Sequence, residues 1–176
     1  MRTRREGFTM IETIVSVVVL GILGVVTAVV LFEAMDAYQR ASVRMSLSQE
    51  ARESMQRMLR EMRTVDYRAS ASTGSKVVLT AAASQVQFVD SSNNDITFDQ
   101  SGATVRRSGD GQVSWDTLCN NVSSLSFTYF NSSNAILSPL PLSAANRDLV
   151  RCWAVELTLS SGGQTIKLRG LVFPRD

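Results

Sequence analysis

The sequence predicts an α+β protein in which a long N-terminal helix packs on a C-terminal antiparallel β-sheet. Two observations lead to this prediction. Neither proline nor glycine interrupts residues 25–72, where apolar residues recur at helical spacing. From about residue 76 the pattern changes to short alternating segments separated by polar turns such as SSNN, SGDG and SSGG. The 176 residues leave room for one folded domain of roughly a hundred residues besides the first part of the helix.

The predicted helix begins as an apolar segment. Thr13 to Phe32 is a run of twenty residues without a charge, and such a helix spans about 30 Å, enough to cross a bilayer. Three arginines lie before it, so the positive-inside rule keeps the N-terminus cytoplasmic and the rest of the chain on the other side. The helical pattern continues beyond Glu33, so we do not expect removal after the apolar run, as in an ordinary signal peptide.

From Glu33 to about Arg68 the predicted helix becomes amphipathic. Its apolar residues follow one another at steps of mostly three or four, which predicts a single stripe facing the sheet. They are Met35, Tyr38, Ala41, Met45, Ala51, Met55, Met58, Met62 and Val65. We interpret the methionines at 45, 55, 58 and 62 as core residues rather than as a metal or ligand surface.

After a small, polar linker that follows Arg68, the alternating pattern predicts eight strands. They are Lys76–Thr80, Gln85–Val89, Asp95–Phe98, Ala103–Arg107, Gln112–Trp115, Val122–Phe130, Val150–Leu159 and Thr165–Phe173. Pro139 and Pro141 rule out a strand between the sixth and seventh of these and predict a long connection there.

Composition limits the possible chemistry. The 18 basic and 16 acidic residues nearly balance, so there is no clear electrostatic footprint for nucleic acid. The absence of histidine removes the commonest general base and the commonest metal ligand. No serine has an evident activating base, and neither a G-x-S-x-G nor an S-x-x-K arrangement occurs. We therefore predict no catalytic residue, no enzyme activity, no cofactor and no metal site.

The sequence has an even number of cysteines, two, and these residues, Cys119 and Cys152, are far apart in sequence. This suits a single disulfide in an oxidising compartment better than it suits a metal site, and in an exported domain we expect the two to pair. The alternative is two independent buried thiols.

Two polar clusters are candidate binding sites. Oxygen ligands for Ca²⁺ are offered by Asp90, Asn93, Asn94, Asp95 and Asp99, but their spacing does not match an EF-hand loop and favours a turn between strands. The arginines at 106 and 107, with Trp115 nearby, could touch DNA or an acidic partner, although a solvated strand end is the preferred interpretation.

The N-terminal stretch RREGFTMIETIV, residues 4–15, combines a basic leader, Gly7, Phe8 and a glutamate, Glu12, at the start of the apolar run. It resembles the N-terminus of type IV pilin-like proteins, the pilins and pseudopilins. In that family prepilin peptidase, a membrane aspartic protease, cuts after the glycine and methylates the new amine, and the apolar helix then assembles into a filament core. The resemblance implies cleavage between Gly7 and Phe8, N-methylation of Phe8, and Glu12 as the fifth residue of the mature chain.

The resemblance also implies an organisation and a set of partners. The expected parts are a leader at 1–7, a transmembrane and filament-core helix at 8–32, an amphipathic helix at 33–68 and a periplasmic β-rich domain at 69–176. The implied partners are prepilin peptidase, other pilin or pseudopilin subunits, an assembly platform protein and the inner membrane. The location would be the inner membrane first, and then a pilus or pseudopilus.

Glu12 also has a physical interpretation that does not depend on the family. An ionised carboxylate inside a bilayer costs roughly 2.5–3.5 kcal/mol on insertion scales, so it should be paired or neutral. Cleavage would create a partner, the α-amino group of Phe8 in a neighbouring subunit, which makes Glu12 an assembly charge. Alternatively, Glu12 lies at the bilayer surface near the arginines and is merely tolerated there.

The apolar helix has Gly21 and Gly24 but no proline, unlike many major pilins, and this favours a minor pilin or a pseudopilin. The cysteine pattern and the C-terminal LRGLVFPRD are similar to those of minor pilins of the PilW type and J-type pseudopilins. We expect a minor type IV pilus subunit that primes assembly or sits near the tip. The alternatives are a type II secretion pseudopilin, an adhesin or DNA-capturing pilin, and a single-pass anchored periplasmic binding protein.

Overall fold

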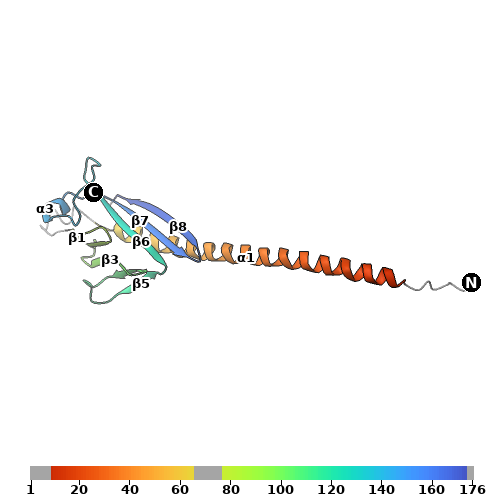
Figure 1. Ribbon diagram of the computed structural model, residues 1–176. Helices are drawn as coiled ribbons and strands as arrows, with labels where there is room; N and C mark the ends of the chain where they lie inside the picture. Colours follow the sequence, from red (N-terminus) through yellow and green to blue (C-terminus); the bar gives the residue numbers. More distant parts are fainter. Residues whose placement is uncertain (1–8, 66–76, 174–176) are drawn as a thin grey trace, which may run out of the picture. The chain divides into compact units, whose positions relative to one another are not determined.

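The computed structural model describes residues 9–65 and 77–173 and has the predicted α+β arrangement, a long N-terminal apolar helix followed by antiparallel strands (Figure 1). The helix α1 (Met10–Met62) is continuous over 53 residues. The strands are β1 (Val78–Ala81), β2 (Gln85–Val89), β3 (Asp95–Ser101), β4 (Thr104–Ser108), β5 (Asp116–Cys119), β6 (Val122–Phe130), β7 (Cys152–Ser161) and β8 (Gln164–Val172). A short helix, α3 (Ala144–Arg147), interrupts the connection from β6 to β7.

The strands form two antiparallel sheets rather than one. The first five follow one another in the order β1-β2-β3-β4-β5, and the last three form a separate sheet in the order β6-β7-β8. Asn121, between β5 and β6, has a positive φ of 57°, and this left-handed residue turns the chain out of the first sheet. The Val122 N–H then donates to the Ala103 carbonyl at 2.9 Å, so the start of β6 stays attached to the β3–β4 turn.

Contacts divide the chain into two units, one up to Ser42 and one from Val43 onward. In the second unit, α1 contacts strands of both sheets. The Ser54 hydroxyl donates to the Leu118 carbonyl on β5 at 3.0 Å, and Glu61 pairs with Arg107 on β4. On β8, Gly170 lies against Leu59. This half of α1 is therefore an integral part of the β-rich unit, as the predicted packing of a helix against strands requires.

Aromatic side chains from both sheets meet in the core. Phe88 of β2 and Trp153 of β7 make an edge contact with ring centroids 5.2 Å apart, and both are fully buried. Tyr129 of β6 is buried as well, and its hydroxyl donates to the Ala82 carbonyl at 2.9 Å. Because this hydroxyl is satisfied, the ring contributes its full apolar area to the core. The two sheets thus share one hydrophobic core.

The predicted stripe on α1 is correct only in its second half. The side chains of Leu47, Ala51, Met55, Met58 and Met62 are buried as α1 packs on the strands. Val65, just past the helix, is buried too.

Four residues of the predicted stripe are instead exposed: Ala41, and Met35, Tyr38 and Met45, of which 63%, 77% and 74% are accessible. The interpretation of Met45 as a core residue is therefore wrong. Leu47, only two residues on, points about 200° away from Met45 around the helix axis, and Leu47 is the residue that faces the strands.

The helix ends at Met62 rather than at the predicted Arg68, which lies outside the described residues. Arg63 and Thr64 form a turn in which the Thr64 N–H donates to the Glu61 carbonyl at 3.0 Å. The Thr64 carbonyl then accepts from the Ser91 N–H, also at 3.0 Å. A hydrogen bond to the distant β2–β3 turn therefore follows directly after the last turn of α1.

Strand positions were predicted well, with one displacement. The spans of β2 and β6 match the prediction, whereas the strand expected at Gln112–Trp115 is found at Asp116–Cys119. The reason is the Asp110 carboxylate, which accepts from the Val113 N–H at 3.1 Å and from the Ser114 N–H at 3.0 Å. These hydrogen bonds hold residues 110–114 in a loop and delay the start of β5.

The predicted disulfide does not form, because Cys119 and Cys152 are both free and buried. Cys119 lies three residues before the start of β6, whereas Cys152 pairs with Phe130 at the end of that strand. The eight residue steps from Val122 to Phe130 span about 26 Å at about 3.3 Å each. A disulfide needs its two Cα atoms within about 7 Å, so these thiols are independent of one another.

Candidate functional site

The candidate site is the N-terminal part of α1. Of the residues expected to carry function there, Gly7 and Phe8 lie outside the described residues, and the description begins at Thr9. Glu12 lies in the first turn of α1. Its N–H donates to the Thr9 carbonyl at 3.1 Å, and its own carbonyl accepts from the Ser16 hydroxyl at 2.7 Å.

The Glu12 side chain is exposed and takes part in none of the ion pairs found among the described residues. Its place in the first helical turn is favourable for a carboxylate, because the N-terminal end of a helix carries partial positive charge. The chain therefore presents this carboxylate at the surface of the helix, where a cationic group could pair with it.

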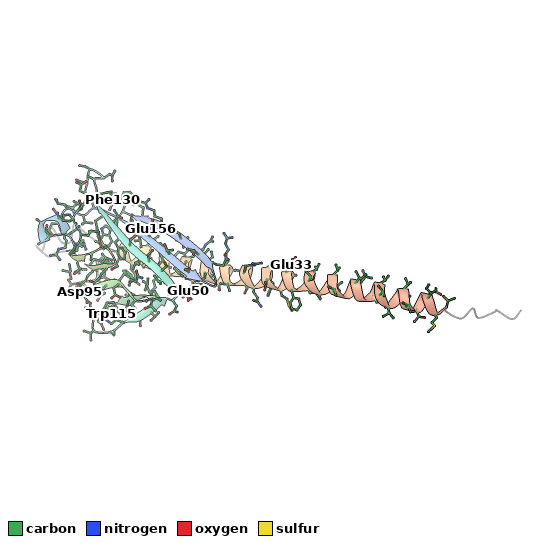
Figure 2. The ribbon with its side chains drawn as sticks, in the orientation of Figure 1. Glu33, Glu50, Asp95, Trp115, Phe130 and Glu156 are labelled. Carbon is green, nitrogen blue, oxygen red and sulfur yellow. The ribbon has the colours of Figure 1, made fainter. Side chains whose placement is uncertain are left out.

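The following stretch of α1 is apolar and exposed on all sides. It is the one helix among the described residues that is long and apolar enough to cross a membrane. None of the most apolar window is buried by the protein itself, and side chains project freely along it (Figure 2). The exposed large side chains in this stretch are Met10, Ile11, Ile14, Val15, Val17, Val18, Val19, Leu20, Ile22, Leu23, Val25, Val26, Val29, Val30, Leu31 and Phe32.

An exposed apolar surface of this extent needs lipid or other helices to cover it. The hydroxyls in this stretch are consistent with an apolar environment. Thr27 donates to the Leu23 carbonyl at 2.8 Å, so its hydroxyl is satisfied within the helix. The helix continues through Gly21 and Gly24, and a Cβ added at either glycine would meet nothing within 4 Å. The segment is therefore a self-contained rod with an apolar surface.

The arginines considered for DNA or acidic partners are engaged within the domain. Arg106 makes two hydrogen bonds to the Asp99 carboxylate, at 3.1 and 2.7 Å, and its guanidinium lies 4.5 Å from the centre of the Trp115 ring. Arg107 pairs with Glu61 at 2.6 Å. These contacts give both side chains a structural role in joining β4 to its neighbours.

The polar cluster considered for calcium is a turn. The Asp90 carboxylate accepts from the Ser92 and Asn94 N–H groups, each at 2.8 Å, so its oxygens organise the β2–β3 connection. Asn93 has a positive φ of 62°, as such a turn requires. In the described part of the chain no group of three or more His, Cys, Asp or Glu residues is placed to hold a metal ion.

The structure reveals one surface that the sequence interpretation missed. The predicted stripe includes Met35, Tyr38 and Met45, and Met45 was interpreted as a core residue, but all three belong to an exposed part of α1 that starts at Glu33, which Figure 2 labels. The signal was available in the sequence, because Tyr38 and Met45 are seven residues apart and share a face that Leu47 does not.

Comparison with known families gives a match at the N-terminus. Residues 2–28 match the model of the prokaryotic N-terminal methylation motif, and the match includes Gly7, Phe8 and Glu12. No curated protein matches the chain. The motif implies processing by prepilin peptidase and assembly with other pilin subunits. The similarity covers the N-terminal segment, whereas the β-rich unit is characterised by its structure alone.

Proposed function

We propose that this chain, which carries the N-terminal methylation motif of type IV pilin-like proteins, is a minor subunit of a type IV pilus. Prepilin peptidase would cut between Gly7 and Phe8 and methylate the new amine of Phe8. The apolar part of α1 would anchor the mature subunit in the inner membrane, with its β-rich unit in the periplasm. The same helix would then pack into the filament.

One observation carries the proposal. The methylation motif leads directly into a helix whose apolar part is wholly exposed and which continues as a helix that packs by one face on the strands of a folded unit. A simple anchor needs only a lipid-covered segment. A subunit that leaves the membrane through its apolar helix must carry its folded unit with it, and α1 runs without a break from Met10 to Met62.

Glu12 would supply the specificity of this assembly. When the helix leaves the lipid for a bundle of helices, an unpaired carboxylate remains costly. Pairing with the Phe8 amine of a neighbouring subunit removes that cost and sets the axial position of one helix against the next. The exposed position of Glu12 in the first turn of α1 leaves its carboxylate accessible to such a partner.

A pseudopilin of a type II secretion system is the second candidate. It is favoured by the uninterrupted passage of α1 through Gly21 and Gly24, since many major pilins carry a proline in this region. The adhesin or DNA-capturing alternative receives less support, because Arg106 and Arg107 are held in contacts within the domain. A single-pass anchored binding protein remains the alternative from a different class.

The decisive experiment is mass spectrometry of the mature N-terminus. The chain is expressed in a host with an active prepilin peptidase and, as a control, in the same host lacking the enzyme. We expect a chain that begins with methylated Phe8 in the first host and one that retains residues 1–7 in the second. An unprocessed N-terminus in both hosts would refute the proposal in favour of a simple anchor.

A second measurement separates pilus from secretion use. Filaments are sheared from cells of the natural host, purified and probed for this chain. Its presence in filaments together with the major pilin supports the pilus subunit. Processing without recovery in pili, combined with a loss of protein secretion when the gene is deleted, supports the pseudopilin.

A further inference from the structure

The two sheets have four edges, and three of them are protected from further pairing. β1 and β5, at the edges of the five-stranded sheet, are only four residues long and have an irregular register. β6 is covered along its free side, because the Phe127 N–H donates to the Ala83 carbonyl at 2.8 Å. The Leu125 N–H likewise donates to the Gln100 side chain, also at 2.8 Å. Short, bulged or covered edges are the usual protection of a sheet against additional strands.

The fourth edge, the free side of β8, has none of these protections. β8 is nine residues long, and its register with β7 runs without a shift from Gln164 to Val172. It is the outermost strand of its sheet (Figure 1). Among residues 9–65 and 77–173, its backbone has no hydrogen bonds except those to β7. A strand of this length offers an edge of about 30 Å to a further strand.

The turn before β8 fixes which of its backbone groups point outward. Gly162 and Gly163 have positive φ values of 56° and 72°. This is the two-residue hairpin turn in which the flanking residues, Ser161 and Gln164, form a hydrogen-bonded pair. Hydrogen-bonded and non-hydrogen-bonded pairs alternate along an antiparallel ladder. Every second residue of β8 therefore directs its N–H and C=O away from β7, and these residues are Thr165, Lys167, Arg169 and Leu171.

The side chains of the same four residues are the exposed ones of β8, and they give this edge a basic character. Glu156 of β7 lies opposite Arg169 but pairs with Lys167, at 2.7 Å. Arg169 takes part in none of the ion pairs found in the described part of the chain. The row ends at Leu171, of which 47% is accessible. A strand added here is most favourable with an acid opposite Arg169 and an apolar residue opposite Leu171.

We propose that the free edge of β8 binds an extended, acidic segment of a different protein chain, which joins β6, β7 and β8 as a fourth strand. Hydrogen bonds to the outward-facing backbone groups supply the affinity, and the alternating side chains supply the specificity. This inference concerns the β-rich unit and goes beyond the proposed function, which concerns α1.

A second copy of this chain does not suit the same edge. If two β8 strands paired along their full length, whether parallel or antiparallel, the basic residues Lys167 and Arg169 of one copy would face those of the other. Like charges directly opposite one another on paired strands are destabilising. The two basic side chains therefore protect the edge from self-association, as charges on edge strands often do. A segment of opposite charge meets no such obstacle.

The test is binding of a synthetic peptide to the full-length chain in detergent micelles. Valine, glutamate, glutamate and threonine occupy alternate positions of the peptide, with threonine between them. In an antiparallel added strand they lie opposite Leu171, Arg169, Lys167 and Thr165. Hydrogen exchange is measured at single-amide resolution with and without the peptide. We expect these four amides to exchange fast in the chain alone and roughly tenfold more slowly with the peptide bound, whereas the alternate amides of β8 are protected throughout.

A charge exchange gives a readout that a merely structural residue would not move. Arg169→Glu should weaken peptide binding by about threefold to tenfold, because an attractive cross-strand pair becomes repulsive. A peptide with lysine in place of the glutamate opposite position 169 should restore binding to this variant. The matched control is a peptide of the same composition with its two glutamates at consecutive positions. One of these glutamates then turns to the other face of the sheet, so this peptide should bind more weakly.

Lys167→Pro tests the backbone pairing. The N–H at position 167 points away from β7, so proline removes no hydrogen bond from the existing ladder but removes one that the added strand needs. Lys167→Thr is the matched control for the loss of charge. We expect the proline variant to lose binding that the threonine variant keeps, with thermal unfolding as the check that both are folded. If the proline variant does not fold, the charge exchange at Arg169 decides.

Fast exchange of the four outward amides in the chain alone, slowed by the peptide, supports the inference. Slow exchange in the chain alone overturns it, because the edge is then covered by this chain or by a second copy. Equal binding of the two peptides overturns it as well. So does a lack of protection at a peptide concentration on the order of 1 mM, where even a weak complex forms. None of these results depends on cleavage after Gly7, so the proposed function is judged separately by the mature N-terminus.

Discussion

Gly170 of β8 lies directly against the side chain of Leu59 of α1. A Cβ atom at position 170 would come within 2.7 Å of both Leu59 methyl carbons and within 3.2 Å of its Cγ. Glycine inside a strand is normally unfavourable, and here it allows α1 to approach the three-stranded sheet. The contact therefore joins α1 to the sheet of β6, β7 and β8.

Gly170→Ala is expected to lower the free energy of unfolding by about 1–3 kcal/mol, because the added methyl forces Leu59 out of its position. Denaturant unfolding of the full-length chain in detergent measures the change. In a Leu59→Ala background, where the obstructing methyls are gone, the same substitution should cost much less. If Gly170→Ala lowers the free energy of unfolding equally in the wild type and in Leu59→Ala, the Gly170–Leu59 contact does not limit how closely α1 approaches the sheet.

Glu61 on α1 accepts from Arg107 of β4 at 2.6 Å and from Arg57 at 3.2 Å. The side chains of Glu61 and Arg107 are mostly covered, whereas that of Arg57 is exposed. We expect Glu61→Gln to destabilise the protein by about 1 kcal/mol through loss of the charged contact between helix and sheet. Glu53→Gln, at an exposed position of the same helix, is the control and should stay within about 0.5 kcal/mol of the wild type. A comparable loss for both variants would argue against a specific role of the pair.

The Asp110 loop makes a prediction about pH. Hydrogen bonds from the Ser114 hydroxyl and N–H, followed by one from the Ser108 hydroxyl, hold the pKa of the Asp110 carboxyl well below its usual value. A lowered folded pKa contributes stability above the unfolded pKa of about 3.9, and this contribution is lost as the pH falls toward the folded value. Between pH 6 and pH 3 the wild type should therefore lose more stability than Asp110→Asn.

Thermal unfolding followed at both pH values checks this prediction. Asp116→Asn, at an exposed position of β5, controls for a general effect of charge removal. If Asp110→Asn and the wild type lose the same stability between pH 6 and pH 3, the loop does not depend on the ionised carboxylate.

The two cysteines should behave as thiols. Burial raises the pKa of both Cys119 and Cys152, so each should react slowly with a maleimide in the native protein. After denaturation without reductant we expect two maleimides per chain by mass spectrometry, and one in Cys119→Ala or Cys152→Ala. An unlabelled wild-type chain that becomes reactive only after reduction would instead indicate a disulfide.

Glu12→Val tests the assembly charge. Removal of a carboxylate from an apolar segment favours insertion, so the variant should still enter the membrane and lose residues 1–7. Incorporation into filaments should fall sharply, because the Phe8 amine loses its proposed partner. Recovery of the variant in sheared filaments at the wild-type level would sink the pairing, and Glu12→Asp, which keeps the charge, is the matched comparison.

Much of this protein could be predicted because the signals were local. The apolar run, the motif around Gly7 and Glu12 and most of the strands depend on residues close to one another in sequence. The methylation motif match at residues 2–28 agrees with that interpretation. Periodicity identifies a helix or strand because each side chain's direction follows directly from backbone geometry.

The errors arose where distant residues decide the outcome. Met45 has the spacing of a core residue, but only the position of the strands shows which side of α1 is covered. The Asp110 hydrogen bonds moved β5 away from an alternating segment that looked like a strand. In both cases a plausible local pattern was overridden by tertiary contacts.

The sequence by itself determined the apolar rod, its N-terminal motif and the antiparallel strands, because backbone geometry and the insolubility of apolar surface act on short stretches of chain. The tertiary structure decided that the strands divide into two sheets, that Cys119 and Cys152 lie at opposite ends of β6, and that α1 keeps a charged face exposed. Each of these properties depends on which residues are close in space. That is decided by how the strands pair and pack, and the spacing of residues along the chain does not reveal it.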